Sequence, residues 1–189
     1  MPKNKAATDN RVPHRIRLIE TTARLLQVQG YRNTGLNQIL DESGAPKGSL
    51  YHYFPGGKEE LAAAAIAHAA TDVATRLTAI CAAEATPQSA IDAVLDHFIA
   101  ELEGSGFQKG CPVATVALEE AGQNPTLQQA CAQAYQAWQA GLEAFFQAHG
   151  HPDAPGEAES FLVALEGALL LSRVRHDTTP LRRLKSARS

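Results

Sequence analysis

The chain has 189 residues, of which 44% are hydrophobic, enough for one domain or for a small domain joined to a larger one with its own core. Residues 1–58 contain nine Lys or Arg and four Asp or Glu, whereas the remaining residues contain eight and sixteen. A basic first part on an acidic remainder indicates that only the first part meets a polyanion. The three cysteines are widely spaced, which excludes a disulfide framework and a paired-cysteine zinc site.

Neither a secretory signal nor a membrane span is expected. No apolar run follows Lys3 and Lys5 near the start of the sequence. The longest apolar stretch, Phe161–Leu171, is interrupted by Glu166 and is shorter than the roughly 20 residues that cross a bilayer. We therefore expect a cytoplasmic protein with reduced thiols and no membrane contact.

Helix-forming residues dominate and alternating strand patterns are absent, which predicts an all-α fold of about nine helices. We expect a flexible polar arm over residues 1–12, a helix-turn-helix DNA-binding head over residues 13–60, and a ligand-binding and dimerisation body over residues 61–189. Glycine and proline positions set the expected helix ends. The predicted helices cover residues 13–30, 36–42, 47–53, 58–83, 87–104, 112–122, 125–149, 156–176 and 179–187.

Residues 36–54 are predicted to form two short helices joined by a tight turn at Gly44. Such a pair can cross at a steep angle, so that the second helix enters a DNA major groove while the first spans the backbone. Ile39, Leu40 and Leu50 are expected to pack the two helices against each other.

A longer string around the second helix is more specific. Residues 43–61 read SGAPKGSLYHYFPGGKEEL, and this string resembles the recognition-helix signature of the TetR family of bacterial repressors. The part GSLYHYFPGGK fits the branch that includes the lincomycin-resistance regulators, and GCPVA at residues 110–114 fits the same branch more weakly. The resemblance extends upstream through Ile19, Ala23, Leu26, Gly30, Tyr31, Thr34 and Ile39.

The resemblance implies a homodimer whose head binds a near-palindromic DNA operator and whose body binds a small-molecule effector that releases the operator. It places Lys58 at the start of a helix, opposite a phosphate, and Thr34 at the entry of the helix that begins near residue 36. Many members have Thr or Ser where this chain has Gly35, so that helix must be capped by Thr34 or by the glycine itself. The DNA-contacting positions implied are Thr34, Lys47, Gly48, Ser49, Tyr51, His52 and Lys58.

The body carries aromatic and small residues that predict an internal ligand site. Small side chains leave space that large rings can line, and sites for drug-sized molecules are mostly apolar with a few polar anchors. We expect a small apolar or aromatic ligand, with a tilt of the helix over residues 58–83 carrying its signal to the DNA. The expected ligand contacts are Phe98, Phe107, Trp138, Phe145 and Phe161, and the candidate anchors are His97, Gln136 and Glu166. Each anchor has an equally good alternative as a surface or structural residue.

Residues 161–171 are apolar on almost every side, which is typical of a helix that is buried all round. Its own subunit would cover one face and a partner subunit the other; the alternative is the central helix of a monomer. We expect the dimer to form through residues 156–176 and 179–187, with its apolar seam at Leu165, Leu169 and Leu170. A two-fold dimer predicts operator half-sites about 34–36 Å apart, or a multiple of one DNA turn.

Enzyme chemistry is not expected, because no Ser-His-Asp set, phosphate-cradling glycine loop or paired metal-ligand motif occurs in the sequence. His149 and His151 flank Gly150 in a predicted loop, which is weak evidence for a metal, so we expect neither a metal nor a cofactor. The predicted function is a sequence-specific transcriptional regulator, most simply a repressor. The alternative is a ligand-binding helical carrier whose head serves only dimerisation, and the basic head argues against it.

Overall fold

The computed structural model describes residues 13–187, and within them it contains nine helices and no strand. The expected all-α fold is confirmed, and the expected arm over residues 1–12 lies outside the described residues. No helix in the described part of the chain combines the length and apolar character needed to cross a membrane. The helices are α1 His14–Gln29, α2 Leu36–Ser43, α3 Lys47–Tyr53, α4 Lys58–Ala82, α5 Pro87–Gly104, α6 Ala114–Glu120, α7 Pro125–Ala148, α8 Ala154–Arg175 and α9 Thr179–Ala187.

Most helix ends lie close to the predicted ones because local capping residues fix them. The Asn124 side chain caps α7 by accepting a hydrogen bond from the Leu127 N–H at 3.0 Å. Helix α8 begins at Ala154, earlier than predicted, because the Asp153 side chain accepts the Gly156 N–H at 3.1 Å and so caps the helix. These ends are therefore properties of the local sequence rather than of the tertiary fold.

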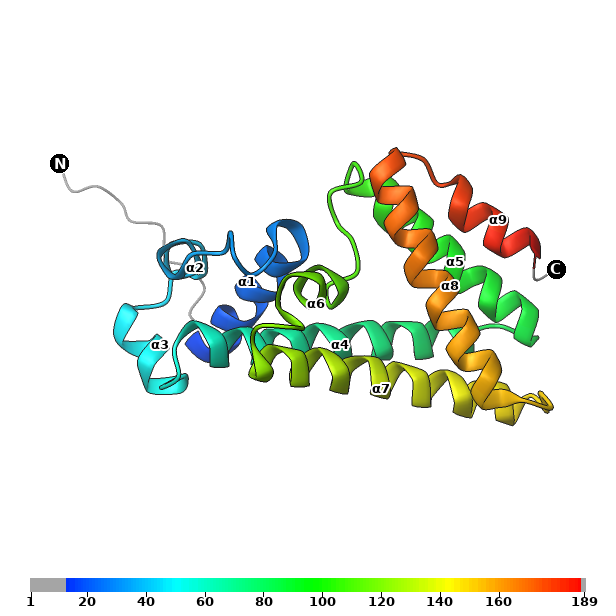
Figure 1. Ribbon diagram of the computed structural model, residues 1–189, viewed down its shortest axis with the longest axis horizontal. Coiled ribbons are helices and arrows are strands. Elements are labelled where there is room, and N and C mark those ends of the chain that lie inside the picture. Colours follow the sequence, from blue (N-terminus) through cyan, green and yellow to red (C-terminus); the bar gives the residue numbers. More distant parts are fainter. Residues whose placement is uncertain (1–12, 188–189) are drawn as a thin grey trace.

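Helices α1, α2 and α3 pack around a small core at one end of the molecule (Figure 1). Ile39 of α2 and Leu50 of α3 are fully buried in this core, and Leu40 packs against it. Gly35 is the N-cap of α2, so no side-chain hydrogen bond caps this helix. Gly44 has a left-handed backbone with φ +62°, which glycine adopts without the steric cost of a side chain. The Gly44 turn therefore sets the direction in which α3 leaves α2.

Helices α4 and α7 lie side by side along the long axis, and α5, α8 and α9 gather at the end remote from α3 (Figure 1). Leu95, Phe161 and Leu181 are fully buried where α5, α8 and α9 meet. Helix α4 packs against α1 near its start and against α5 near its end. The predicted domain boundary at residue 60 therefore falls inside one continuous helix.

Helix α8 has one buried face and one exposed face. Leu165 and Leu169 are only 5% and 6% exposed because they pack into the core formed with α5 and α9. These two residues therefore cannot form the apolar dimer seam that the sequence predicted, whereas Leu170 is 52% exposed. The large apolar residues that α8 leaves exposed are Val163, Leu170, Leu171 and Val174.

Candidate DNA interface, ligand cavity and the junction between them

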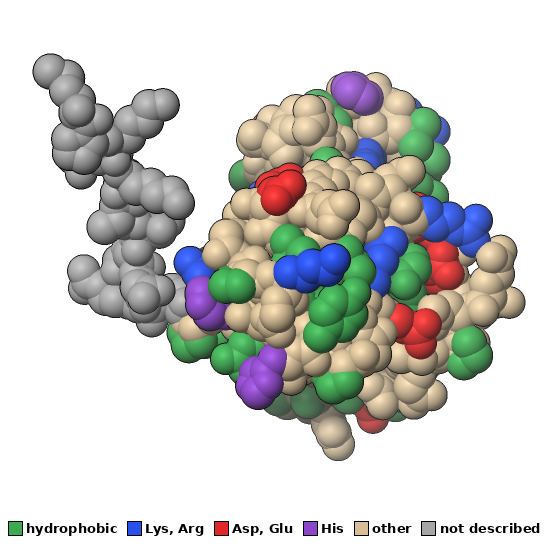
Figure 2. Space-filling view, turned by 90° about the vertical axis from the view of Figure 1, so that its left-hand side faces the viewer, with side chains coloured by type: hydrophobic (Ala, Val, Ile, Leu, Met, Phe, Trp, Pro, Cys, Tyr) green, Lys and Arg blue, Asp and Glu red, His purple; other side chains and the backbone are tan. Residues whose placement is uncertain are grey.

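Helix α3 presents a polar and aromatic face at the end of the molecule. Leu50 and Phe54 turn inward and are at most 2% exposed, which holds α3 and the turn after it against the head core. Figure 2 looks onto this end and shows Lys or Arg, His and apolar side chains together on it. The residues of α3 that were expected to contact DNA are Lys47, Gly48, Ser49, Tyr51 and His52. Ser49 is half-buried, and the other four are exposed.

The exposed groups of α3 are chemically suited to both kinds of contact that DNA recognition needs. Lysine, serine, tyrosine and histidine can bond to phosphates, and the same side chains can reach donors and acceptors on base edges. Tyr51 is 49% exposed, and the His52 ring stands edge-on to the Tyr53 ring with centroids 4.8 Å apart. The face therefore combines hydrogen-bonding groups with rings that are available for apolar contact.

Thr34 and Lys58 do not point outward, which corrects the expectation for both residues. The Thr34 side chain is 0% exposed, and its hydroxyl donates to the Gly30 carbonyl oxygen at 2.6 Å. Lys58 Nζ donates to the Tyr31 carbonyl oxygen at 2.7 Å and lies 4.0 Å from the Tyr31 ring centroid. Burial lowers the pKa of Lys58, against the opposing effect of two carboxylates of α6. Both side chains therefore stabilise the segment between α1 and α2 instead of facing DNA.

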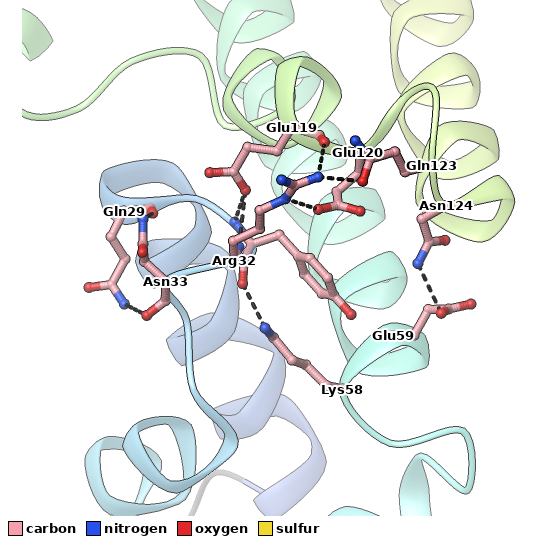
Figure 3. Close-up of polar contacts among 10 residues, drawn as sticks. Gln29, Arg32, Asn33, Lys58, Glu59, Glu119, Glu120, Gln123 and Asn124 are labelled. Atoms are coloured by element: carbon pink, nitrogen blue, oxygen red, sulfur yellow. Dashed lines mark hydrogen bonds and ion pairs between the residues drawn. The ribbon is translucent and has the colours of Figure 1, made fainter.

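A carboxylate of α6 binds the backbone of that same segment (Figure 3). Glu119 Oε2 accepts the N–H groups of Tyr31 and Arg32 at 2.7 and 3.0 Å. Gly30 precedes them with φ +78° and ψ −179°, a backbone region that is essentially restricted to glycine. A Cβ added at Gly30 would lie 2.1 Å from Glu119 Oε1. We call this arrangement of Glu119 and residues 30–32 the α6 clamp.

Arg32 extends the α6 clamp with its side chain (Figure 3). Its Nε donates to Glu120 Oε1 at 2.9 Å, and its Nη2 donates to the Glu119 carbonyl oxygen at 3.0 Å and to Gln123 Oε1 at 2.6 Å. Glu120 is only 7% exposed, so its buried charge depends on this partner. Sequence reasoning missed these contacts because the partners lie 87 or more positions apart in the chain.

The body contains a largely apolar cavity of about 580 Å³ between α4, α5, α7 and α8. Sites for small molecules typically measure roughly 300–1,000 Å³. Phe107 was expected in its wall but is not part of it, and its ring instead lies 5.3 Å from that of His176 between centroids. The expected aromatic residues that do line the cavity are Phe98, Trp138, Phe145 and Phe161.

Two of the candidate anchors reach the cavity. His97 and Glu166 line it, whereas Gln136 is exposed on α7 and lies outside its wall. Burial lowers the pKa of His97 and so favours the neutral imidazole. Burial raises the pKa of Glu166, and interactions with the Cys111 thiol and the Tyr135 hydroxyl oppose that rise. Burial also raises the pKa of Cys111, so this thiol is not activated as a nucleophile.

Two hydrogen bonds connect the surroundings of the cavity to α1. Gln27 Nε2 donates to the Gly110 carbonyl oxygen at 2.8 Å, and both residues line the cavity. Arg173 Nη2 of α8 donates to the Val28 carbonyl oxygen of α1 at 3.3 Å. The end of α1 that precedes the α6 clamp is therefore in direct contact with the cavity wall.

Metal-binding geometry is absent from the part of the chain that the structure describes: no group of three or more His, Cys, Asp or Glu side chains there could hold an ion. His149 Nδ1 forms a hydrogen bond with the Phe145 carbonyl oxygen at 2.8 Å. His151 Nδ1 accepts the Asp153 N–H at 3.3 Å. Both histidines are therefore bound locally to their own turn.

Two sequence families match the chain. Residues 18–65 match the family described as bacterial regulatory proteins, tetR family. Residues 87–187 match the family described as transcriptional regulator LmrA/YxaF-like, C-terminal domain. The first match contains most of α1 together with α2 and α3, and the second contains the helices that form most of the cavity wall.

Known proteins match over nearly the whole chain. The HTH-type transcriptional regulator LmrA of Bacillus subtilis is 35% identical over 174 residues, which cover 91% of this chain and 93% of LmrA. An uncharacterized HTH-type transcriptional regulator of Mycobacterium tuberculosis is 35% identical over 177 residues, 88% of each chain. The crystal structure of the regulatory protein TetR from Rhodobacter sphaeroides superimposes with a TM-score of 0.82 at 24% identity, covering 92% of this chain and 95% of that one.

Lys47 and Lys58 are expected to differ in their response to salt. Lys47→Ala should reduce the slope of log affinity against log salt concentration by about 0.9 for each phosphate that the side chain neutralises. Lys58→Ala should leave the slope unchanged and lower the free energy of unfolding by about 1 kcal/mol, because it removes one hydrogen bond to Tyr31. Gel-shift titrations at several salt concentrations and urea unfolding measure both effects. A flatter slope for Lys58→Ala would restore the phosphate contact that the sequence suggested.

The α6 clamp predicts that Gly30→Ala destabilises the protein more than Gly44→Ala. Both glycines have positive φ, and a Cβ in the left-handed conformation of Gly44 costs about 1–2 kcal/mol. A Cβ at Gly44 meets nothing within 4 Å, whereas one at Gly30 displaces the Glu119 carboxylate from its two N–H partners. Urea unfolding gives both costs, and their difference should shrink in a Glu119→Ala background. Equal costs in the wild-type background would contradict the clamp.

Proposed function

The chain belongs to the TetR family of bacterial regulatory proteins and is a DNA-binding transcriptional regulator, and we propose that it is a homodimeric repressor that a small apolar or aromatic molecule releases from its operator. The cytoplasm, where operator DNA lies, is its proposed place of action. LmrA and the Mycobacterium tuberculosis relative are described as HTH-type transcriptional regulators, and catalysis is not part of the proposal.

We assign operator recognition to the exposed face of α3. Lys47 lies at the start of the helix, where a phosphate contact would position it on the duplex. Tyr51 and His52 lie one turn further along the helix and are exposed, so we assign them to the base edges of the major groove. The buried Leu50 on the opposite face holds the helix against the head while these side chains read DNA.

The observation that carries the ligand-release proposal is the hydrogen bond between Gln27 and Gly110. It joins α1, on which α2 and α3 are packed, to a segment of the cavity wall. A ligand that displaces this segment must therefore either move α1 or break the bond. Because packed interfaces switch between discrete arrangements, a small displacement here can reorient the head.

The α6 clamp provides a second connection between the two sites. Helix α6 follows Gly110 closely in the chain, and Glu119 near its end binds the segment that leads into α2. Helix α4 also runs from Lys58, which bonds to the same segment, to Val73 and Leu77 in the cavity wall. The tilt of α4 expected from the sequence is thus one of several contacts that can carry the signal.

The positions of the exposed apolar residues argue against the alternative function, a ligand carrier whose head serves only dimerisation. The head leaves no large aliphatic side chain exposed, whereas α8 leaves a row of them. The outward face of α9 beside it is polar, and Lys185 and Arg182 pair with Asp96 and Glu103 of α5 at 2.7 and 3.2 Å. We therefore place the dimer interface on the exposed face of α8.

Charge on the exposed face of α8 is expected to split the dimer. The double substitution Leu170→Glu and Val174→Glu should produce monomers, because paired subunits would bury several uncompensated carboxylates. Both side chains are exposed in the single subunit, so its free energy of unfolding should change little. Light scattering and gel shift measure assembly and operator binding. Gln133→Glu, on the exposed surface of α7, is the charge control and should remain dimeric. A double variant that still dimerises would place the interface elsewhere.

Filling the cavity is expected to abolish ligand binding without abolishing DNA binding. Ala74 of α4 lines the cavity, and Ala74→Trp should remove the binding of Nile red, a neutral fluorescent probe of apolar sites. Ala67→Trp places the same ring on the exposed face of the same helix and is the matched control. Both variants should still shift operator DNA. Nile red binding that survives in Ala74→Trp would contradict the assigned cavity.

A releasing ligand should also obey thermodynamic linkage. A compound that weakens operator binding tenfold must itself bind tenfold less well to the operator complex, a coupling of about 1.4 kcal/mol.

A further inference from the structure

Glu166 of α8 lies where two cavities meet. It lines the main cavity of about 580 Å³ and also a second one of about 440 Å³ between α6 and α8. Cys111 lines both cavities beside it, Tyr135 lines the second, and the Cys111 thiol lies 3.9 Å from the Tyr135 hydroxyl oxygen. A carboxyl group is thus placed against largely apolar space with only weak or uncharged donors around it.

Within the described residues of one subunit, no Lys, Arg or His forms an ion pair with this carboxyl, although Arg76 and Lys109 also line the main cavity. The ion pairs found among residues 13–187 do not include Glu166. Arg173 lines the second cavity as well, but its guanidinium donates to the Val28 carbonyl oxygen and lies against Gly110. Removing a carboxylate from water without a counter-charge is costly, and a protein keeps it ionised only if a cation or several hydrogen bonds compensate. The missing counter-charge can be supplied by a ligand.

We propose that the cavity binds amphipathic molecules that carry a positively charged amine on an apolar or aromatic body, with Glu166 as the counter-ion of the amine. This inference rests on the proposed ligand site and names the chemical class that the site takes. The rings of Phe98, Trp138 and Phe161 line the main cavity and would stabilise such a molecule in two ways. They bury its apolar body, and aromatic faces attract a desolvated cation.

The same contact explains how a bound amine would act on the head. An ammonium group that draws the Glu166 carboxylate towards it competes with the Cys111 thiol for that carboxylate. Cys111 directly follows Gly110, whose carbonyl oxygen accepts the hydrogen bond from Gln27 of α1. Occupation of Glu166 by a cation therefore alters the segment that joins the cavity to the head.

Two probes of the same shape test the proposal. 4-Biphenylmethylamine carries an ammonium group at neutral pH, and 4-biphenylmethanol has a neutral hydroxyl in its place. Trp138 is the only tryptophan in the sequence and lines the cavity, so its fluorescence reports binding. We expect the amine to bind the wild-type protein at least about tenfold more tightly than the alcohol, a difference of ~1.4 kcal/mol.

Glu166→Gln should bind the amine and the alcohol with about equal affinity. Its affinity for the alcohol should stay within about threefold of the wild-type value. The free energy of unfolding of Glu166→Gln should not fall, because this variant removes a poorly compensated charge. Measuring it distinguishes a loss of binding from a loss of folded protein. Glu159→Gln is the matched control on the exposed surface of α8 and should keep the full preference.

The outcomes separate this inference from the proposed function. Equal affinities of both probes for the wild-type protein would overturn the assignment of a cationic ligand and leave the internal ligand site standing. A preference for the amine that persists in Glu166→Gln would overturn the role of Glu166 alone. Failure of both probes to bind would overturn the inference together with the internal site.

Discussion

The contact on which the rest of the structure depends is the one between the Glu119 carboxylate and the two N–H groups that follow Gly30. Charge-assisted bonds from backbone N–H groups to a carboxylate are stronger than neutral ones, and here they hold a backbone shape that glycine alone adopts readily. The segment they hold connects α1 to α2, and α2 leads through one turn to α3. The α6 clamp therefore helps to fix the position of α3 relative to the body.

The cavity lies within reach of this contact because α1 belongs to both parts of the molecule. Its first half packs in the head core, while Gln27 near its end bonds to the cavity wall. A ligand can shift such a protein between two arrangements only by as much as its affinities for them differ. In the proposed mechanism, the wall segment at Gly110 would be arranged differently with and without a ligand, and the difference in affinity would arise there.

Helix α8 presents three kinds of surface. The residues of its buried face pack against α5 and α9, its carboxyl faces the cavities, and its remaining apolar residues lie on the surface. A carboxyl in apolar surroundings lowers stability unless something compensates its charge, and functional sites are where proteins retain such groups. Glu166 and Leu170 are one helical turn apart and both line the second cavity, so binding and assembly would act on adjoining faces of the same helix.

The sequence by itself determined the helices, the helix-turn-helix and the family, because caps, glycine turns and the string over residues 43–61 are local signals. It also identified the exposed face of α3 and most of the aromatic cavity wall. Only the tertiary structure decided the directions of Thr34 and Lys58, which point into the junction, and the burial of Leu165 and Leu169. The physical reason is that a helix apolar on every side does not reveal which face meets its own core. Contacts such as Gln27 with Gly110, 83 positions apart, exist only once the chain has folded.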